Sequence, residues 1–162
     1  LALCDAAETV YNGKVDRDLV VVGALVHDVF KSLTYAERPN GSYASAALAE
    51  RLDHLTLGVA ELIRRGFPLS IVHIVDSHMG WQHGPIGPRT VEALVVHLAD
   101  MADSQLNGEV LRAAQYLLRE GAGVELNRIT ATEAFEIVNA KTQNGWEAVP
   151  KVLDRIRKRR KE

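Results

Sequence analysis

Apolar residues recur at the three- and four-residue spacing of an α-helix along almost the whole chain, and no stretch alternates apolar and polar residues between hairpin turns. This pattern predicts an all-α fold. The chain has 162 residues, of which 47% are hydrophobic and 25% charged, which is typical of a compact domain. We therefore predict a single domain over residues 1–162.

Glycine, proline and capping residues divide this pattern into separate helices. The predicted helices cover residues 1–11, 16–31, 45–65, 69–79, a stretch from 90, 109–120, a stretch from 130 and a stretch after 145. The helix over 16–31 contains the segment LVVVGALV, which is apolar on every side and is predicted to lie at the centre of the bundle. Loops are predicted over 32–45 and 80–88, and Thr130 and Glu133 are predicted to form a capping box.

Charge and cysteine content narrow the class of protein. Lysine and arginine number 19 against 21 aspartate and glutamate residues, a formal net charge of -2, which argues against a surface built as a whole for nucleic acid. Cys4 is the single cysteine, so no internal disulfide is expected.

No apolar run reaches the roughly 18 residues that span a bilayer, and the chain starts without a basic leader, so we expect a cytoplasmic protein with no membrane partner. Because the chain begins with Leu1, we expect a truncated N-terminus.

A doublet of histidine and aspartate, His27 and Asp28, directly follows the most apolar segment. A metal ion would compensate the cost of burying a charge there. His54, His78 and Asp100 follow at intervals of 26, 24 and 22 residues, each on a separate predicted helix. One inward-facing ligand from each of several helices is a usual way to build a metal centre in a bundle. The alternatives are an exposed helix end at the doublet and scattered surface histidines.

This order of residues resembles the HD superfamily of metal-dependent phosphohydrolases. The surrounding segments are similar to those of YhaM-type 3′ to 5′ exoribonucleases and their relatives, and they read DRDLVVVGALVHDVFK, DHLTLG, SHMG and TVEALVVHLADMAD. The resemblance implies an all-α HD-domain bundle of about seven helices. It also implies that the bundle binds one or two divalent metal ions, which would be Mn, Fe, Ni, Co or Mg. It implies that His27, Asp28 and Asp100 hold a first metal, and that Asp28 bridges to a second metal held by His54 and His78.

The sequence departs from the HD pattern at two places. The family has an early histidine before the doublet, and by its spacing this residue falls upstream of Leu1. Met79 stands where the family commonly has a second consecutive histidine after His78. A centre with a single metal ion is therefore an alternative.

The resemblance also implies a reaction. Two metal ions about 3.5 to 4 Å apart would activate a water molecule that attacks phosphorus, so the expected activity is hydrolysis of a phosphate ester of a nucleotide or of a nucleic-acid 3′ end. Asp28, Lys31 and Asp103 are the candidate catalytic residues, and Lys31, Arg89 and His83 are the candidate contacts for the substrate phosphate. From spacing alone, Lys31 is equally a solvated lysine and Asp103 equally a partner in a salt bridge.

Two other functions remain open from the sequence. The chain is alternatively a non-catalytic HD-type nucleotide-binding or regulatory module, or a helical interaction domain without metal. The basic run Arg155 to Lys161 could bind a phosphate backbone, although such runs commonly only offset a helix dipole. The expected partners are a nucleotide or short nucleic-acid substrate, with a second copy of the chain in a homo-oligomer as a further candidate.

Overall fold

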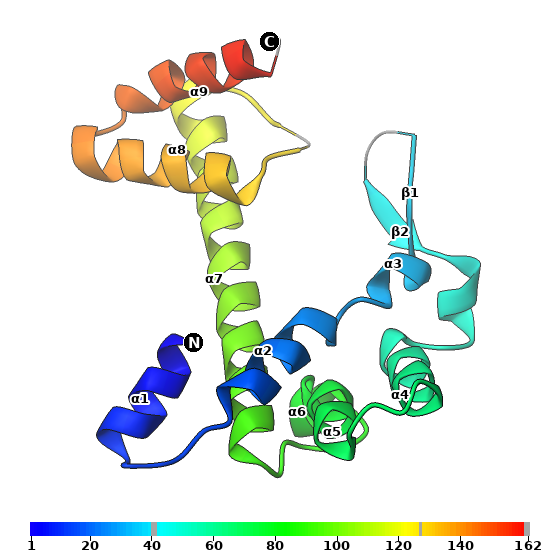
Figure 1. The fold of residues 1–162 in the computed structure, drawn as a ribbon. Helices are drawn as coiled ribbons and strands as arrows, with labels where there is room; N and C mark the ends of the chain where they lie inside the picture. The colour runs from blue at the N-terminus through cyan, green and yellow to red at the C-terminus, as the bar shows by residue number, and fades with distance from the viewer. Residues whose placement is uncertain (40–41, 127, 161–162) are drawn as a thin grey trace. The chain divides into compact units, whose positions relative to one another are not determined.

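Helices form most of the regular structure in the computed structural model, which describes residues 1–39, 42–126 and 128–160 (Figure 1). In chain order they are α1 (Ala2–Val10), α2 (Arg17–Val26), α3 (Lys31–Thr34), the 3₁₀ turn η1 (Ala47–Glu50), α4 (His54–Arg64), α5 (Leu69–Ser77), α6 (Gly80–His83), α7 (Val91–Ala122), α8 (Ala131–Asn144) and α9 (Ala148–Arg159). Because α3 and α6 have four residues each, seven longer helices remain in the described part of the chain. The predicted all-α fold is confirmed.

One short hairpin lies in a segment that was predicted to be a loop. Strand β1 (Tyr35–Glu37) pairs antiparallel with β2 (Tyr43–Ser45), and Tyr35 stands opposite Ser45. The prediction of a loop over 32–45 is therefore wrong for both strands. Strands of three residues are too short to show a period of two, so the apolar pattern could not reveal them. Asn40 and Gly41, on which the loop prediction partly depended, lie outside the described residues.

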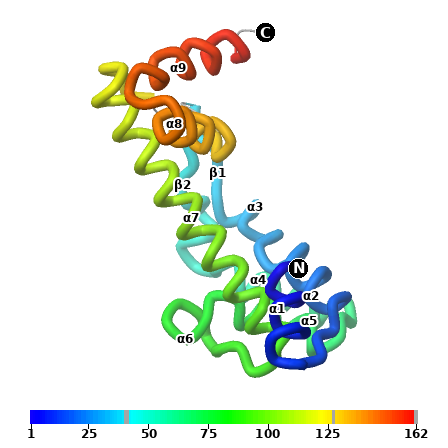
Figure 2. The backbone as a smooth tube through the Cα atoms, turned by 90° about the vertical axis from the view of Figure 1, so that its left-hand side faces the viewer, coloured from blue at the N-terminus to red at the C-terminus, as the bar shows by residue number. Residues whose placement is uncertain are grey.

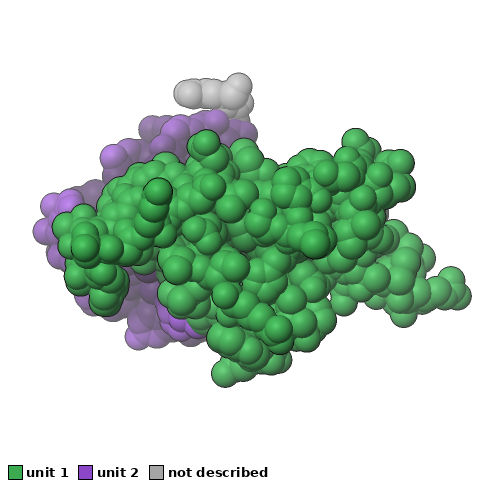
Figure 3. All heavy atoms as spheres, turned by 60° about the horizontal axis from the view of Figure 1, so that its bottom comes forward, with its two compact units in different colours: residues 1–102 green, residues 103–162 purple. Residues whose placement is uncertain are grey.

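The chain divides into two compact units, Leu1–Ala102 and Asp103–Glu162, which Figure 3 colours green and purple. The first unit contains α1 to α6, the hairpin and the start of α7, and the second contains the rest of α7 with α8 and α9 (Figure 2). Each unit has a buried apolar cluster of its own. In the described part of the chain, no helix offers an apolar stretch of the length needed to cross a bilayer.

Helix α5 is the central helix of the first unit, because α2 and α4 both pack against it. Ile74 and Val75 of α5 are fully buried. Gly23 lets α2 approach α5 closely, since a Cβ atom at this position would lie 2.5 Å from Cγ2 of Ile74. The prediction that the apolar segment of α2 is buried on every side is wrong: Val20 is buried, but Leu25 is 74% exposed. Helix α2 therefore buries one face and leaves the other exposed.

Several helix boundaries differ from the predicted ones. Helix α4 begins at His54 and not at Ser45, because the Asp53 carboxylate caps it by accepting a hydrogen bond of 2.7 Å from the backbone N–H of Thr56. Helix α6 forms a single turn inside the segment predicted to be irregular. Helix α7 is one helix of 32 residues where two were predicted. The start of α4 matters most for function, because it fixes the position of His54.

The second unit is held together by the packing of α8 and α9. Val149, Val152, Leu153 and Ile156 lie on the predicted apolar face of α9 and are buried. The predicted capping box is confirmed: the Glu133 N–H donates to Thr130 Oγ1 at 3.3 Å, and the Thr130 N–H donates to Glu133 Oε2 at 2.8 Å. Arg160 also donates two hydrogen bonds to Glu133, of 2.9 and 2.6 Å. Glu133 thus ties the start of α8 to the residue that follows α9. Lys161, the last residue of the predicted basic run, lies outside the described residues.

We expect Glu133→Gln to lower the free energy of unfolding by about 1 to 2 kcal/mol at pH 7, because it removes the charge from several hydrogen bonds. The Arg160 guanidinium lowers the pKa of Glu133 from 4.5 to about 2. A carboxylate with a lowered pKa stabilises the folded state fully above pH 4.5, and this contribution is lost as the pH falls towards about 2. Urea denaturation at a series of pH values measures both effects. Glu125→Gln, at an exposed position of the same unit, is the control; an equal effect of the two substitutions would contradict the assignment.

Candidate metal centre

Segments from four parts of the first unit bring the predicted metal ligands together. His27 and Asp28 directly follow α2, His54 is the first residue of α4, His78 directly follows α5, and Asp100 lies on α7. The five side chains form two overlapping groups, and within each group the potential ligand atoms lie within 4.8 Å of one another. The predicted convergence of these residues is therefore observed.

The first group consists of Asp28, His54 and His78. Nε2 of His54 and Nε2 of His78 each lie 3.5 Å from the same oxygen, Oδ1 of Asp28. Helices α4 and α5 pack against each other and so hold the two imidazoles. The group therefore presents two nitrogen atoms and one carboxylate oxygen to a common point.

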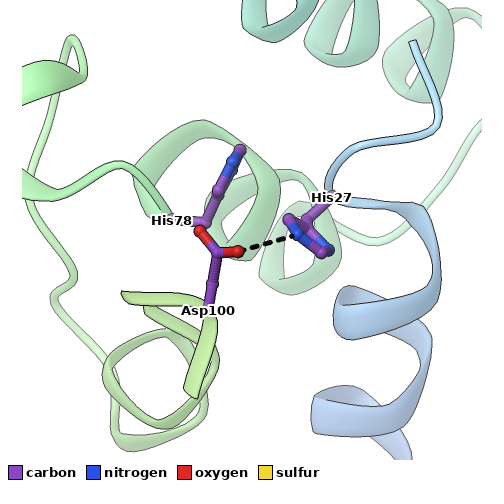
Figure 4. Close-up of side chains that lie close together, drawn as sticks. All are labelled: His27, His78 and Asp100. Carbon is purple, nitrogen blue, oxygen red and sulfur yellow. Dashed lines mark ion pairs between the residues drawn. The ribbon is translucent and has the colours of Figure 1, made fainter. Parts of the chain in front are cut away.

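The second group consists of His27, His78 and Asp100 (Figure 4). Nε2 of His27 lies 3.5 Å from Oδ1 of Asp100 and 3.4 Å from Oδ2 of Asp28. The two oxygens of Asp28 therefore face different partners: Oδ1 faces His54 and His78, whereas Oδ2 faces His27. This arrangement agrees with the bridging position that the HD resemblance implies for Asp28.

Three of the inward-facing atoms are buried and unpaired. Asp28 Oδ1, His54 Nε2 and His78 Nε2 have no hydrogen-bond partner among the described residues. Buried polar atoms without a partner are rare, because each costs the free energy of its lost hydration. These atoms therefore mark the point at which a further group is expected to bind.

Hydrogen bonds to the backbone prepare two of the imidazoles for metal binding. Nδ1 of His27 lies 2.8 Å from the carbonyl oxygen of Ala24, and Nδ1 of His78 lies 2.7 Å from that of Val75. A carbonyl oxygen only accepts hydrogen bonds, so Nδ1 carries the proton in both rings. In the neutral ring, the lone pair of each Nε2 is then free to bind a cation, as in most metal-binding histidines.

The donor atoms and their spacing fit a divalent cation of the first transition row. Imidazole nitrogen and carboxylate oxygen are ligands that suit Mn, Fe, Co, Ni and Zn. Ligand atoms bound about 2.1 Å from one ion at tetrahedral angles stand about 3.4 Å apart. The observed separations of 3.4 and 3.5 Å agree with this spacing. The five residues could therefore hold one or two such ions.

The charges in the site are coupled through Asp28. Burial opposes ionisation of this carboxyl, but the neighbouring imidazoles of His27 and His78 and the hydrogen bond from the Lys31 ammonium group outweigh it and hold the pKa of Asp28 well below its usual range. The Asp28 carboxylate in turn raises the pKa of His27 against the effect of burial. Burial lowers the pKa of His54. Asp28 is thus held as a carboxylate and His54 as a neutral imidazole, which are the forms that bind metals.

Among the described residues, Lys31 is the only candidate substrate-binding residue whose side chain makes a polar contact with a candidate metal ligand. Its Nζ donates a hydrogen bond of 2.6 Å to Oδ2 of Asp28. The lysine side chain is 38% exposed and the Asp28 side chain 30% exposed, so this ion pair lies at the edge of the site, partly open to solvent. Asp103 lies three residues after Asp100 on α7, but it belongs to the second unit.

Arg89 and His83 lie on the segment between α5 and α7. The backbone N–H of Arg89 donates a hydrogen bond of 3.0 Å to Nε2 of His73, which anchors this segment to α5, and the Arg89 side chain is exposed. His83 is exposed on α6 and lines a groove together with Asp53 and Asp76. Within the described residues, neither side chain forms a hydrogen bond or ion pair with the five candidate metal ligands.

No role was expected from the sequence for the glycine that follows His78 and Met79. Gly80 has a φ of +70°, and a Cβ atom built on it would lie 2.6 Å from Cε1 of His97. Its backbone conformation and the neighbouring imidazole thus both favour glycine. A glycine shortly after a candidate ligand was the only available signal, and it does not reveal the contact with a histidine 17 residues later.

We expect Gly80→Ala to destabilise the protein more than Gly66→Ala. Both glycines have a left-handed backbone, with φ of +70° and +74°, but no atom lies within 4 Å of a Cβ at Gly66. Alanine should cost about 1 kcal/mol at Gly66 for the backbone alone, and about 2 kcal/mol or more at Gly80, where His97 must also move. Chemical denaturation of the two variants measures the difference. Equal costs would show that the His97 contact does not constrain this position.

Comparisons with known proteins identify the family of this chain. The HD domain family matches residues 2–104. The chain is 37% identical over 145 residues to a dihydroneopterin 2′,3′-cyclic phosphate phosphodiesterase of Methanocaldococcus jannaschii, an alignment that covers 90% of this chain and 57% of that protein. It is also 36% identical over 87 residues to a ribonuclease Y of Acidothermus cellulolyticus, over 53% of this chain and 14% of that protein. The chain thus spans little more than half of the first relative and a small part of the second. No solved structure matches the chain significantly.

The family match contains all five candidate ligands, from His27 to Asp100. It covers more than half of the chain, and the alignment to the archaeal phosphodiesterase extends over nearly all of it. The resemblance seen in the sequence is confirmed: the chain belongs to the HD domain superfamily of metal-dependent phosphohydrolases.

Proposed function

We propose that this chain is a metal-dependent phosphodiesterase whose substrate is a nucleotide or a nucleic-acid 3′ end. The observation that supports this best is the convergence of three buried, unpaired ligand atoms, Asp28 Oδ1, His54 Nε2 and His78 Nε2. Buried polar atoms without a hydrogen-bond partner are rare in a core that only stabilises the fold. The names of both relatives describe enzymes that cleave phosphoric esters, which supports the same chemistry here.

The two oxygens of Asp28 support a centre with two ions. Asp28, His54 and His78 would hold one ion, and His27, Asp28 and Asp100 would hold the other. An imidazole Nε2 has one lone pair, so His78 serves only one ion although it lies near both groups. A divalent ion in such a site supplies an acidified water molecule and neutralises charge on the phosphate oxygens.

The protein itself contributes charge and orientation. Asp28 holds the ammonium group of Lys31 at 2.6 Å, and the exposed side of this group can receive a phosphate oxygen of the substrate. Under the same proposal, the exposed side chains of Arg89 and His83 contact the rest of the substrate. Water attacks phosphorus directly, so no serine, cysteine or histidine side chain is required as a nucleophile.

The relatives suggest two kinds of phosphodiester for testing. One acts by its name on a 2′,3′-cyclic phosphate, and the other is a ribonuclease. A substrate panel should therefore contain 2′,3′-cyclic nucleotides, the cyclic phosphate of dihydroneopterin, short RNAs and the generic diester bis-p-nitrophenyl phosphate. We expect hydrolysis of the generic diester and of at least one natural diester with Mn²⁺, Fe²⁺, Co²⁺, Ni²⁺ or Mg²⁺, and none with excess EDTA. Nucleotide binding without turnover under every metal would instead support a regulatory module, and hydrolysis unaffected by EDTA would contradict a metal centre.

A further inference from the structure

His97 contacts the backbone at the point where α5 ends and the candidate ligand His78 begins the next segment. We propose that His97 is a positioning residue of the metal centre, which sets the place of the His78 imidazole through a hydrogen bond to the His78 backbone. This proposal depends on the proposed function only in that the centre binds a divalent cation. His97 belongs to neither group of candidate ligands.

The hydrogen bond is short and its direction is defined. Nδ1 of His97 lies 2.6 Å from the carbonyl oxygen of His78. Because that oxygen can only accept, His97 carries its proton on Nδ1 and donates it. The last carbonyl groups of a helix have no partner within the helix, and His78 directly follows the last residue of α5. A side chain from α7 therefore supplies a donor that α5 itself lacks.

The chain leaves room for this imidazole. Gly80 lies two residues after His78, and the place where its Cβ would stand is 2.6 Å from Cε1 and 3.0 Å from Nε2 of His97. Any other residue at this position would push the ring away from the His78 carbonyl group. The absence of a side chain at Gly80 thus makes room for the His97 imidazole beside the His78 carbonyl group.

The contact links two helices that carry candidate ligands. Asp100 lies three residues after His97, one turn further along α7, whereas His78 directly follows α5. The ligand atoms of His78 and Asp100 lie within 4.8 Å of each other. A hydrogen bond between the same two segments therefore limits how far these ligands can move apart. The hydrogen bond from Nδ1 of His78 to the carbonyl oxygen of Val75 then fixes the orientation of the imidazole and so the direction of its Nε2.

The test measures the dissociation constant of Mn²⁺ by isothermal titration calorimetry on the metal-free full chain. His97→Leu removes the donor and puts an apolar side chain of similar size in its place, whereas His97→Asn keeps an N–H donor at nearly the position of Nδ1. Loss of a group that orients a metal ligand typically weakens metal binding about 10- to 100-fold. We expect this loss for His97→Leu, and binding within about threefold of the original protein for His97→Asn.

His73→Leu is the matched control, because it removes another imidazole that makes a single hydrogen bond to the backbone, here from the N–H of Arg89. We expect it to leave the Mn²⁺ dissociation constant within about twofold. Unchanged Mn²⁺ binding in His97→Leu would overturn the proposal, and so would equal weakening in His97→Leu and His97→Asn. Equal weakening in His73→Leu would also overturn it, since the effect would then be general loss of structure. If the original protein bound no Mn²⁺, the proposed function itself would fail, which is a different result from a normal centre that does not respond to His97.

Discussion

Asp28→Asn should lower kcat/KM for bis-p-nitrophenyl phosphate by about a thousandfold or more in the presence of Mn²⁺. The substitution keeps the shape of the side chain but removes the charge that His27, His54, His78 and Lys31 all face. An amide offers one oxygen and one N–H₂ group, so it cannot present an oxygen to both sets of imidazoles. Both ions should therefore bind weakly, and the rate should fall to a level close to that without metal.

A matched control separates the site from general effects on α2. Asp18→Asn removes an exposed carboxylate from the first turn of the same helix, and we expect kcat/KM to stay within about twofold. Circular dichroism of both variants checks that the helices remain. Activity of Asp28→Asn within tenfold of the original protein would contradict the role of Asp28 at the centre of the site.

Removal of metal should lower the stability of the protein, and His78→Ala should weaken this dependence by removing a ligand of one of the two proposed ions. A ligand that binds only the folded state at a concentration one hundred times its dissociation constant stabilises it by about 2.7 kcal/mol. We therefore expect Mn²⁺ at that excess to raise the free energy of unfolding by about this amount for each ion bound, relative to EDTA. His78 is the most buried of the three candidate histidine ligands, at 1% exposed. Its replacement by alanine leaves the group of Asp28, His54 and His78 without one of its two nitrogen ligands.

Urea denaturation with Mn²⁺ and with EDTA measures this dependence. His78→Ala should show a clearly smaller difference between the two solutions, whereas His73→Ala, which changes a histidine of α5 outside both groups, should keep the full difference. An undiminished Mn²⁺ effect in His78→Ala, or an equal reduction in His73→Ala, would contradict the assignment of His78 as a ligand.

The candidate metal centre was accessible from the sequence because its chemistry depends on residue types in a fixed order. The doublet His27–Asp28, two later histidines and Asp100 each lie beside an apolar segment, and all five converge in the structure. Sequence order does not give the orientation of individual atoms. That Oδ1 of Asp28 faces two imidazoles and Oδ2 a third follows only from the packing of α2, α4 and α5.

The fold was predicted in class but not at several of its boundaries. Helical spacing predicted the all-α class because long amphipathic helices repeat the signal many times. The hairpin at Tyr35 and Tyr43 has strands of three residues and gives no such repetition. The apolar segment of α2 indicated burial on every side, but composition does not show that Leu25 lies on an exposed face. The contact between Gly80 and His97 joins residues on different elements, so local patterns could not predict it.

Anomalous X-ray diffraction from Mn²⁺-soaked crystals tests the central claim most directly. We predict a manganese peak at bonding distance, about 2.0 to 2.3 Å, from Asp28 Oδ1, His54 Nε2 and His78 Nε2, and a second beside His27, Asp28 Oδ2 and Asp100 in fully occupied crystals. A peak at the first position alone would support a centre with one ion. No peak near Asp28, or manganese bound only elsewhere on the surface, would contradict the claim that these side chains form a metal centre.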